Sequence, residues 1–173
     1  MNYLVFFSSC TYLVLLLVLA CLSVHLTCKL FSNFDKKNIN FNSDLKKGNA
    51  AVGLCFASYI LSMTIMMKNS ISSGMSNLQS IINSEEINIE FIFEGIGYIV
   101  IQFILCFLLT LLVILIASRL YRFMTADIDE MLEISNGNVT VALVFSAVLI
   151  SISTISSAGI DMLVGSLIPF KFH

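Results

Sequence analysis

Four long apolar stretches without a charged residue constrain the fold of this 173-residue chain more than any other feature. They cover residues 3–28, 49–67, 95–118 and 138–160. A helix needs about 20 apolar residues to cross the hydrocarbon of a bilayer. Backbone N–H and C=O groups must be hydrogen-bonded in lipid, so continuous apolar runs of this length predict helices. We therefore expect an all-α integral membrane protein with four transmembrane helices.

The composition supports a lipid bilayer as the surrounding solvent. The chain is 58% hydrophobic and 12% charged, with a mean hydropathy of +0.95, whereas a soluble domain is about half apolar and a quarter charged. The net charge of −2 offers no basic surface for nucleic acid. The five cysteines lie in apolar stretches without a CxxC pair. We expect buried thiols, with no disulfide framework, metal site or cofactor.

Lys and Arg are distributed unevenly between the two predicted sides of the membrane. Seven of the nine fall in or beside the first and third connections. Because Lys and Arg are enriched in cytoplasmic loops, loops 32–47 and 119–137 are predicted to be cytoplasmic and both termini to be outside. The abundance of Asn, Ile, Lys and Phe is typical of an AT-rich bacterial genome, so a bacterial inner membrane is the expected location.

The first apolar stretch has an alternative interpretation as a cleaved lipoprotein signal. Residues 18–21, Val-Leu-Ala-Cys, resemble a lipobox. No Lys or Arg precedes this segment, and the apolar run continues past Cys21. These two observations favour a retained helix.

The second and fourth stretches share a sequence pattern. At an offset of 89 residues, segments 48–71 and 137–160 are identical at seven positions, including the polar starts Gly48-Asn49 and Gly137-Asn138. We interpret the chain as two two-helix repeats in parallel orientation. The predicted division is 1–76 (spans about 3–31 and 49–70), an outer loop at 77–91, 92–168 (spans about 92–121 and 138–165) and a C-terminal tail at 169–173.

The two repeated segments, KGNAAVGLCFASYILSMTI and NGNVTVALVFSAVLISIST, carry a family resemblance. They resemble the duplicated signature of the YjfL-like bacterial inner-membrane family, catalogued as domain of unknown function 350. The resemblance implies four helices, an unestablished activity and an association with membrane stress or envelope maintenance, and it supplies no catalytic residues. The chain departs from the family pattern at Val139 and Thr140, where small residues are usual, and at Ser58 and Ala147, near positions where glycine is common.

Two interpretations of the repeated Gly-Asn starts remain open. In the first, Gly48 and Gly137 release the backbone from the loop, and Asn49 and Asn138 accept hydrogen bonds from the first N–H groups of a helix. In the second, the two Asn side chains and two helix N-termini form an anion-attracting or gating site.

Polar residues near the ends of the stretches suggest two further features. Lys68 and Asp161 are predicted to lie at the outer interface, either as separate anchors or as an ion pair that closes an outer mouth. Small residues allow close packing of membrane helices. Helix packing is the expected role of two small-xxx-small pairs, Ser58 with Ser62 and Ala142 with Ser146.

The acidic segment TADIDEMLEI precedes the fourth stretch. Its pattern favours a short amphipathic interfacial helix over a metal site. Ile128, Met131 and Leu132 would lie on the apolar side, and the acidic residues would form a wet face.

Three classes of function are compatible with this sequence. The favoured class is a non-enzymatic membrane component or scaffold whose partner is a peripheral cytoplasmic protein or a second copy of itself. The alternative is a small ion or solute channel or permease, with a pathway at the repeat or oligomer interface. An intramembrane enzyme is the weakest hypothesis, because no GxSxG, HExxH or P-loop pattern is present.

Overall fold

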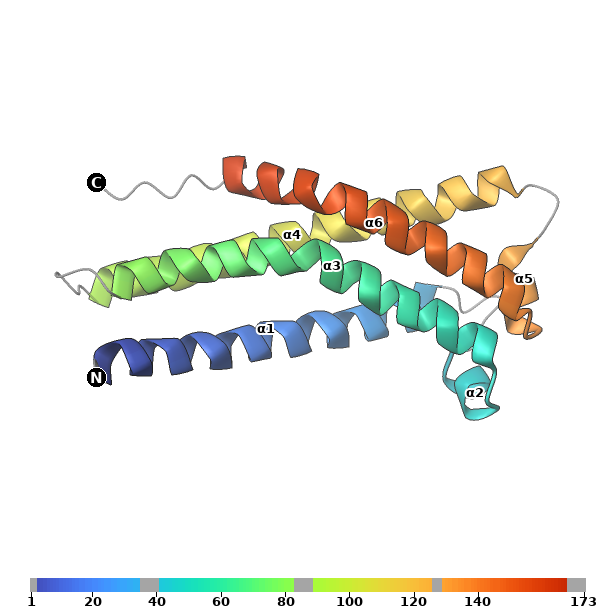
Figure 1. Ribbon diagram of the computed structural model, residues 1–173, viewed down its shortest axis with the longest axis horizontal. Helices are drawn as coiled ribbons and strands as arrows, with labels where there is room; N and C mark the ends of the chain where they lie inside the picture. Colours follow the sequence, from blue (N-terminus) through green and yellow to red (C-terminus); the bar gives the residue numbers. More distant parts are fainter. Residues whose placement is uncertain (1–2, 35–40, 83–88, 126–128, 168–173) are drawn as a thin grey trace.

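The computed structural model describes residues 3–34, 41–82, 89–125 and 129–167, all of which lie in helices or the short turns between them (Figure 1). Four helices are long and two are short. In chain order they are α1 (Tyr3–Phe34), α2 (Phe41–Lys46), α3 (Ala50–Ile82), α4 (Ile89–Met124), α5 (Glu130–Ser135) and α6 (Val139–Leu167).

The long helices are apolar enough to cross a membrane. Their spanning segments are Leu13–Leu30, Ala50–Lys68, Gly95–Met124 and Val139–Ser166. Large side chains on their outer faces are exposed, such as Leu17 at 57% and Leu108 at 57%. Contact of such side chains with lipid carries no free-energy penalty, whereas their exposure to water does. The prediction of an all-helical protein with four membrane-spanning helices is confirmed.

The long helices alternate in direction (Figure 1). α1 and α4 run one way, and α3 and α6 run the other. The beginning of α1 and the end of α6 lie toward one end of the molecule, and the short helices α2 and α5 lie at the opposite end. Because α1–α3 and α4–α6 have the same direction, the fold has the polarity that parallel repeats require.

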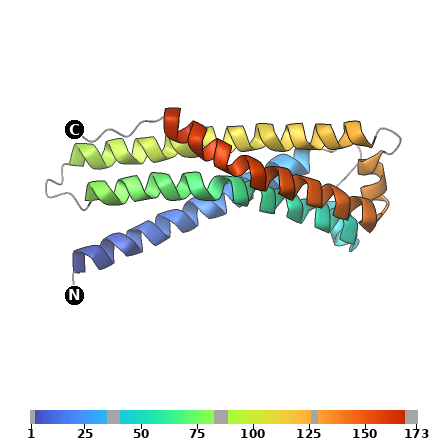
Figure 2. The same cartoon turned by 45° about the horizontal axis from the view of Figure 1, so that its top comes forward.

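α3 occupies the centre of the bundle. It packs against α1, α4 and α6, and α4 also packs against α6. α1 separates from α3 toward Tyr3, as a second view shows (Figure 2). The centre is aromatic at one level, where the buried Phe145 ring meets Tyr59 of α3 at 5.8 Å and Tyr121 of α4 at 5.4 Å, both edge to face. This cluster joins three helices through one side chain.

The helices extend further than the sequence predicted. In the predicted outer loop 77–91, residues 77–82 belong to α3 and residues 89–91 to α4. The expected loop 119–137 contains the last turn of α4 and the whole of α5. The apolar stretch marks where a helix meets lipid, and backbone hydrogen bonds continue through polar residues beyond that point. The expected tail at 169–173 lies outside the described residues.

Candidate functional site

The end of the molecule that carries α2 and α5 holds a cluster of polar contacts. We call it the junction, and it consists of α2, α5 and the first residues of α3 and α6. Two glycines shape it. Gly48 has φ +77° and Gly137 has φ +92°, both in the left-handed region that favours glycine. Each glycine follows a short helix, and the asparagine after it immediately precedes the first residue of a long one.

Both turns use the same backbone hydrogen bonds. The Gly48 N–H donates to Leu45 O at 3.0 Å and the Asn49 N–H to Asp44 O at 3.0 Å. At an offset of 89 residues, Gly137 N–H donates to Ile134 O at 3.0 Å and Asn138 N–H to Glu133 O at 2.9 Å. This pair of bonds is the Schellman motif, which satisfies the last carbonyls of a helix. The sequence similarity at these two starts therefore corresponds to the same local backbone.

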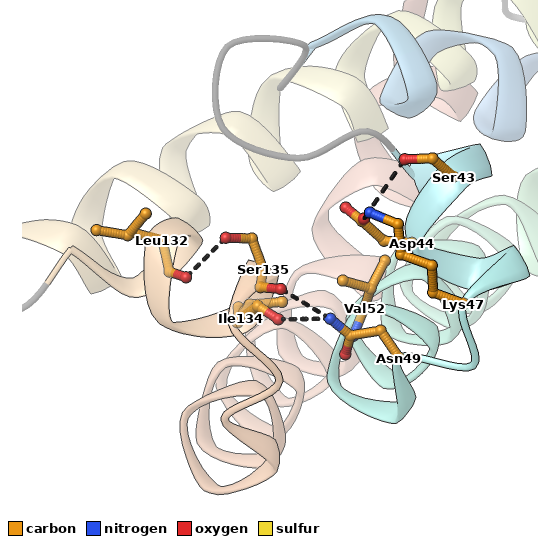
Figure 3. A network of polar contacts seen from close by, with 8 residues as sticks. All are labelled: Ser43, Asp44, Lys47, Asn49, Val52, Leu132, Ile134 and Ser135. Atoms are coloured by element: carbon orange, nitrogen blue, oxygen red, sulfur yellow. Dashed lines mark hydrogen bonds and ion pairs between the residues drawn. The ribbon is translucent and has the colours of Figure 1, made fainter.

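Asn49 begins α3 and also connects it to α5 (Figure 3). Its Oδ1 accepts hydrogen bonds from Ala51 N at 3.0 Å and Val52 N at 3.2 Å. Its Nδ2 donates to Ser135 O at 2.9 Å and Ile134 O at 3.3 Å, across 86 and 85 residues of chain. One side chain thus caps α3 and satisfies two carbonyls at the end of α5.

Asn138 begins α6 in a similar way but has a different second partner. Its Oδ1 accepts from Val141 N at 3.3 Å. Its Nδ2 donates to the Glu133 carboxylate at 2.8 Å, only five residues away in the chain. Both asparagines thus cap a long helix, but only Asn49 also bonds to residues distant in the sequence. Both amide groups donate hydrogen bonds, to backbone carbonyls in one case and to a neighbouring carboxylate in the other. The gating site stays a prediction.

α5 places one carboxyl group in the interior. Asp129 caps this helix by accepting from Leu132 N at 3.2 Å, and Glu130, Met131 and Ile134 are buried. The short helix is as predicted, but its faces are not: Glu130 is only 3% exposed, whereas Leu132 is 49% exposed. The cap at Asp129 fixes where the helix begins and turns residues 130, 131 and 134 inward together. Ile128 lies outside the described residues.

The remaining predicted residues occupy the contact of α3 with α6 or the far half of these helices. Ala142 is fully buried, Ser58 donates to Cys55 O at 2.7 Å, and Ser146 donates across the contact to Leu54 O at 3.3 Å. Lys68 is exposed and Asp161 is half-buried. Their proposed ion pair stays a prediction; the surface pair found at the junction is Lys47 with Asp44 at 3.2 Å.

The structure buries three hydroxyl groups that lack a hydrogen-bond partner. Ser62, Thr110 and Ser153 are at most 1% exposed, and their oxygens have no hydrogen-bond partner among the described residues. A helix-packing role was predicted for Ser62, but the missing partner was not. In the sequence these three resemble every other hydroxyl residue of an apolar helix, so only tertiary packing distinguishes them.

Comparison with known proteins identifies a family but no activity. No curated protein and no solved structure matches the chain. The sequence profile of the family described as Domain of Unknown Function (DUF350) matches residues 2–160, which include all of α1 to α5 and most of α6. The chain therefore belongs to the DUF350 family.

Proposed function

We propose that this protein is a non-enzymatic scaffold of a bacterial inner membrane, built by duplication of a two-helix unit and linked to envelope maintenance or stress. The observation that carries the proposal is the use of Asn49. Its amide makes four hydrogen bonds, all to backbone groups, and two of them join α3 to α5. A scaffold needs a contact face of fixed shape, and a cross-link between the two halves of the chain supports such a face.

The junction offers apolar side chains to a partner. Leu45 of α2 is 40% exposed and Leu132 of α5 is 49% exposed. The distribution of Lys and Arg supports a cytoplasmic location for this end of the protein, where acyl chains would not cover the two leucines. A peripheral cytoplasmic protein is the proposed partner, and a second copy of the chain is the other candidate.

The proposal is tested by affinity purification of the full chain from native membranes in a mild detergent. We expect the wild type to retain a stoichiometric partner and Leu45→Asp with Leu132→Asp to lose it. Lys46→Ala is the matched control, because it changes an exposed side chain next to Leu45 and leaves both leucines in place. A wild-type protein that purifies alone, or a double variant that keeps the partner, contradicts the scaffold.

A channel or permease is the second candidate, because polar hydroxyl groups lie inside the bundle. It predicts solute or ion flux through the wild-type protein in liposomes and loss of that flux in Asn49→Leu combined with Asn138→Leu. Circular dichroism of the same sample checks that the helices remain. A wild type without flux of any kind supports the scaffold instead.

The proposed orientation has its own test. In a variant without native cysteines, Asn42→Cys lies in the first connection, which we propose to be cytoplasmic. An impermeant thiol reagent added outside spheroplasts should leave it unlabelled until the membrane is opened. Labelling of closed spheroplasts would reverse the orientation.

A further inference from the structure

Hydroxyl groups in these long helices usually bond to the backbone of their own helix. Ser58 donates to Cys55 O at 2.7 Å, Thr64 to Ile60 O at 2.8 Å and Thr154 to Ile150 O at 2.7 Å. Such a bond satisfies the hydroxyl without help from another helix or from solvent. It is the ordinary solution for Ser and Thr in lipid, and the chain uses it whether the residue is buried or exposed.

Ser62, Thr110 and Ser153 break this pattern. They are 0%, 0% and 1% exposed, respectively, and none of the three oxygens has a partner among the described residues. A buried hydroxyl without a hydrogen bond carries a desolvation penalty of about 1–3 kcal/mol. Native proteins therefore satisfy almost all such groups, either directly or through an ordered water. Three exceptions in one bundle call for a shared explanation.

The three hydroxyls lie at a similar depth. Ser62 is 12 residues beyond Ala50, the first residue of α3, and Ser153 is 14 beyond Val139, the first of α6. Thr110 is 14 residues before Met124, the last of α4. At 1.5 Å per residue these positions are about 18, 21 and 21 Å from the junction end of each helix. All three helices reach that end together (Figure 1), so the hydroxyls share one level to within about one turn.

They also lie on the faces where these helices meet. α3, α4 and α6 pack against one another in all three pairs. Ser62 continues the buried stripe of Ser58, and Thr110 lies between the buried Cys106 and Ile114. Ser153 follows the buried Leu149 by one turn. Each hydroxyl therefore lies on the buried face of its helix.

The chemistry of this level excludes a charged ligand. Residues 50–67, 95–118 and 139–160 contain no Asp, Glu, Lys or Arg. A bare ion in an apolar interior needs a counter-charge or a nearly complete shell of oxygen ligands, and three hydroxyls supply neither. Three groups that can each donate or accept match the two to four hydrogen bonds made by a buried water.

We propose that Ser62, Thr110 and Ser153 form a binding site for a small neutral polar ligand, with water as its ordinary occupant. The site joins α3, α4 and α6 halfway through the bundle. It makes no use of the junction and does not depend on the scaffold function. Its bound water is a structural bridge that satisfies all three hydroxyls at once.

The test is a set of substitutions that keep shape and remove the hydroxyl, in the full chain in detergent micelles. Ser62→Ala, Thr110→Val and Ser153→Ala are expected to raise the unfolding equilibrium constant by about tenfold each, because each removes one bond of the bridge. Pairs of them should cost less than the product of the single effects, because the groups share one ligand. If the hydroxyls were dry, each substitution would relieve a desolvation penalty and stabilise the protein, and the effects would multiply independently.

Matched controls are available on the same helices. Ser58→Ala removes a buried hydroxyl of α3 that already bonds to its own helix, and Thr154→Val does the same for an exposed hydroxyl of α6. Neither should show coupling to Ser153→Ala. Coupling of the controls as strong as that among the three site residues would overturn the shared bridge.

Radiolytic hydroxyl-radical labelling gives a second measurement that does not depend on stability. Radicals formed at a bound water oxidise neighbouring sulfur atoms, and Met63 and Met66, at 1% and 0% exposed, follow Ser62 on α3. Both should be labelled in the wild type and several-fold less in Ser62→Ala combined with Thr110→Val. Met131, buried in α5, should be unaffected by that pair. Absence of labelling at Met63 and Met66 in the wild type would refute a bound water.

Discussion

Removing the Asn49 side chain should destabilise the protein more than removing its counterpart Asn138. Asn49→Ala deletes a helix cap, worth about 1 kcal/mol, and two hydrogen bonds to carbonyls of α5, worth about 1 kcal/mol each. The sum is about 3 kcal/mol. Asn138→Ala deletes one capping bond and the bond to Glu133. Its expected effect is about 2 kcal/mol, because the carboxylate can be resolvated where it is partly exposed.

Serine at the same positions separates the two contributions. Asn49→Ser keeps an oxygen that can cap α3 but cannot reach Ser135 O, so it should recover about 1 kcal/mol of the loss seen with alanine and leave about 2 kcal/mol of it. The measurement is reversible unfolding of the full chain in mixed micelles, followed by circular dichroism. Equal effects of Asn49→Ala and Asn138→Ala, or full recovery in Asn49→Ser, would show that the link to α5 does not stabilise the fold.

Two further predictions concern the core and the turns. Phe145→Ala should destabilise the bundle by about 3 kcal/mol, since Phe145 is fully buried between two tyrosine rings. Leu143→Ala, at a side chain 58% exposed, should change the same unfolding midpoint little. Similar losses in the two variants would show that the Phe145 cluster is not a centre of packing. Gly48→Ala and Gly137→Ala should each cost about 1 kcal/mol, because a Cβ there meets no atom within 4 Å and the penalty is the positive φ alone. Gly97→Ala, also without a neighbour within 4 Å but helical, should be neutral or slightly stabilising, and an equal loss at Gly97 would contradict the role of φ.

The sequence was sufficient to predict the four spanning helices, because their apolar length has one physical solution in lipid. It also identified Gly48-Asn49 and Gly137-Asn138 as related helix starts. It could not predict that Asn49 bonds to α5 across 85 and 86 residues of chain while Asn138 bonds to Glu133, five residues away, since that difference depends on which elements become neighbours.

The burial of two kinds of polar group also escaped sequence analysis. Glu130 was expected on a wet face, but the cap at Asp129 turned it inward. Ser62, Thr110 and Ser153 have no distinguishing pattern along the chain, and only the packing of three helices removes them from solvent. Sequence analysis thus predicted polar groups that act locally, such as the helix caps. It missed polar groups whose environment is decided by tertiary packing.

The central place of α3 has a consequence for assembly. The buried hydrophobic cluster, as far as the described residues show it, is contributed by α3, α4, α5 and α6, and the hydrophobic side chains that α1 adds to it are only partly buried: Leu19, Leu26 and Leu30. α1 precedes α3, its main neighbour, in the chain and is therefore synthesised before it. During membrane insertion α1 must remain without this packing partner until α3 follows, and the bundle then assembles around α3.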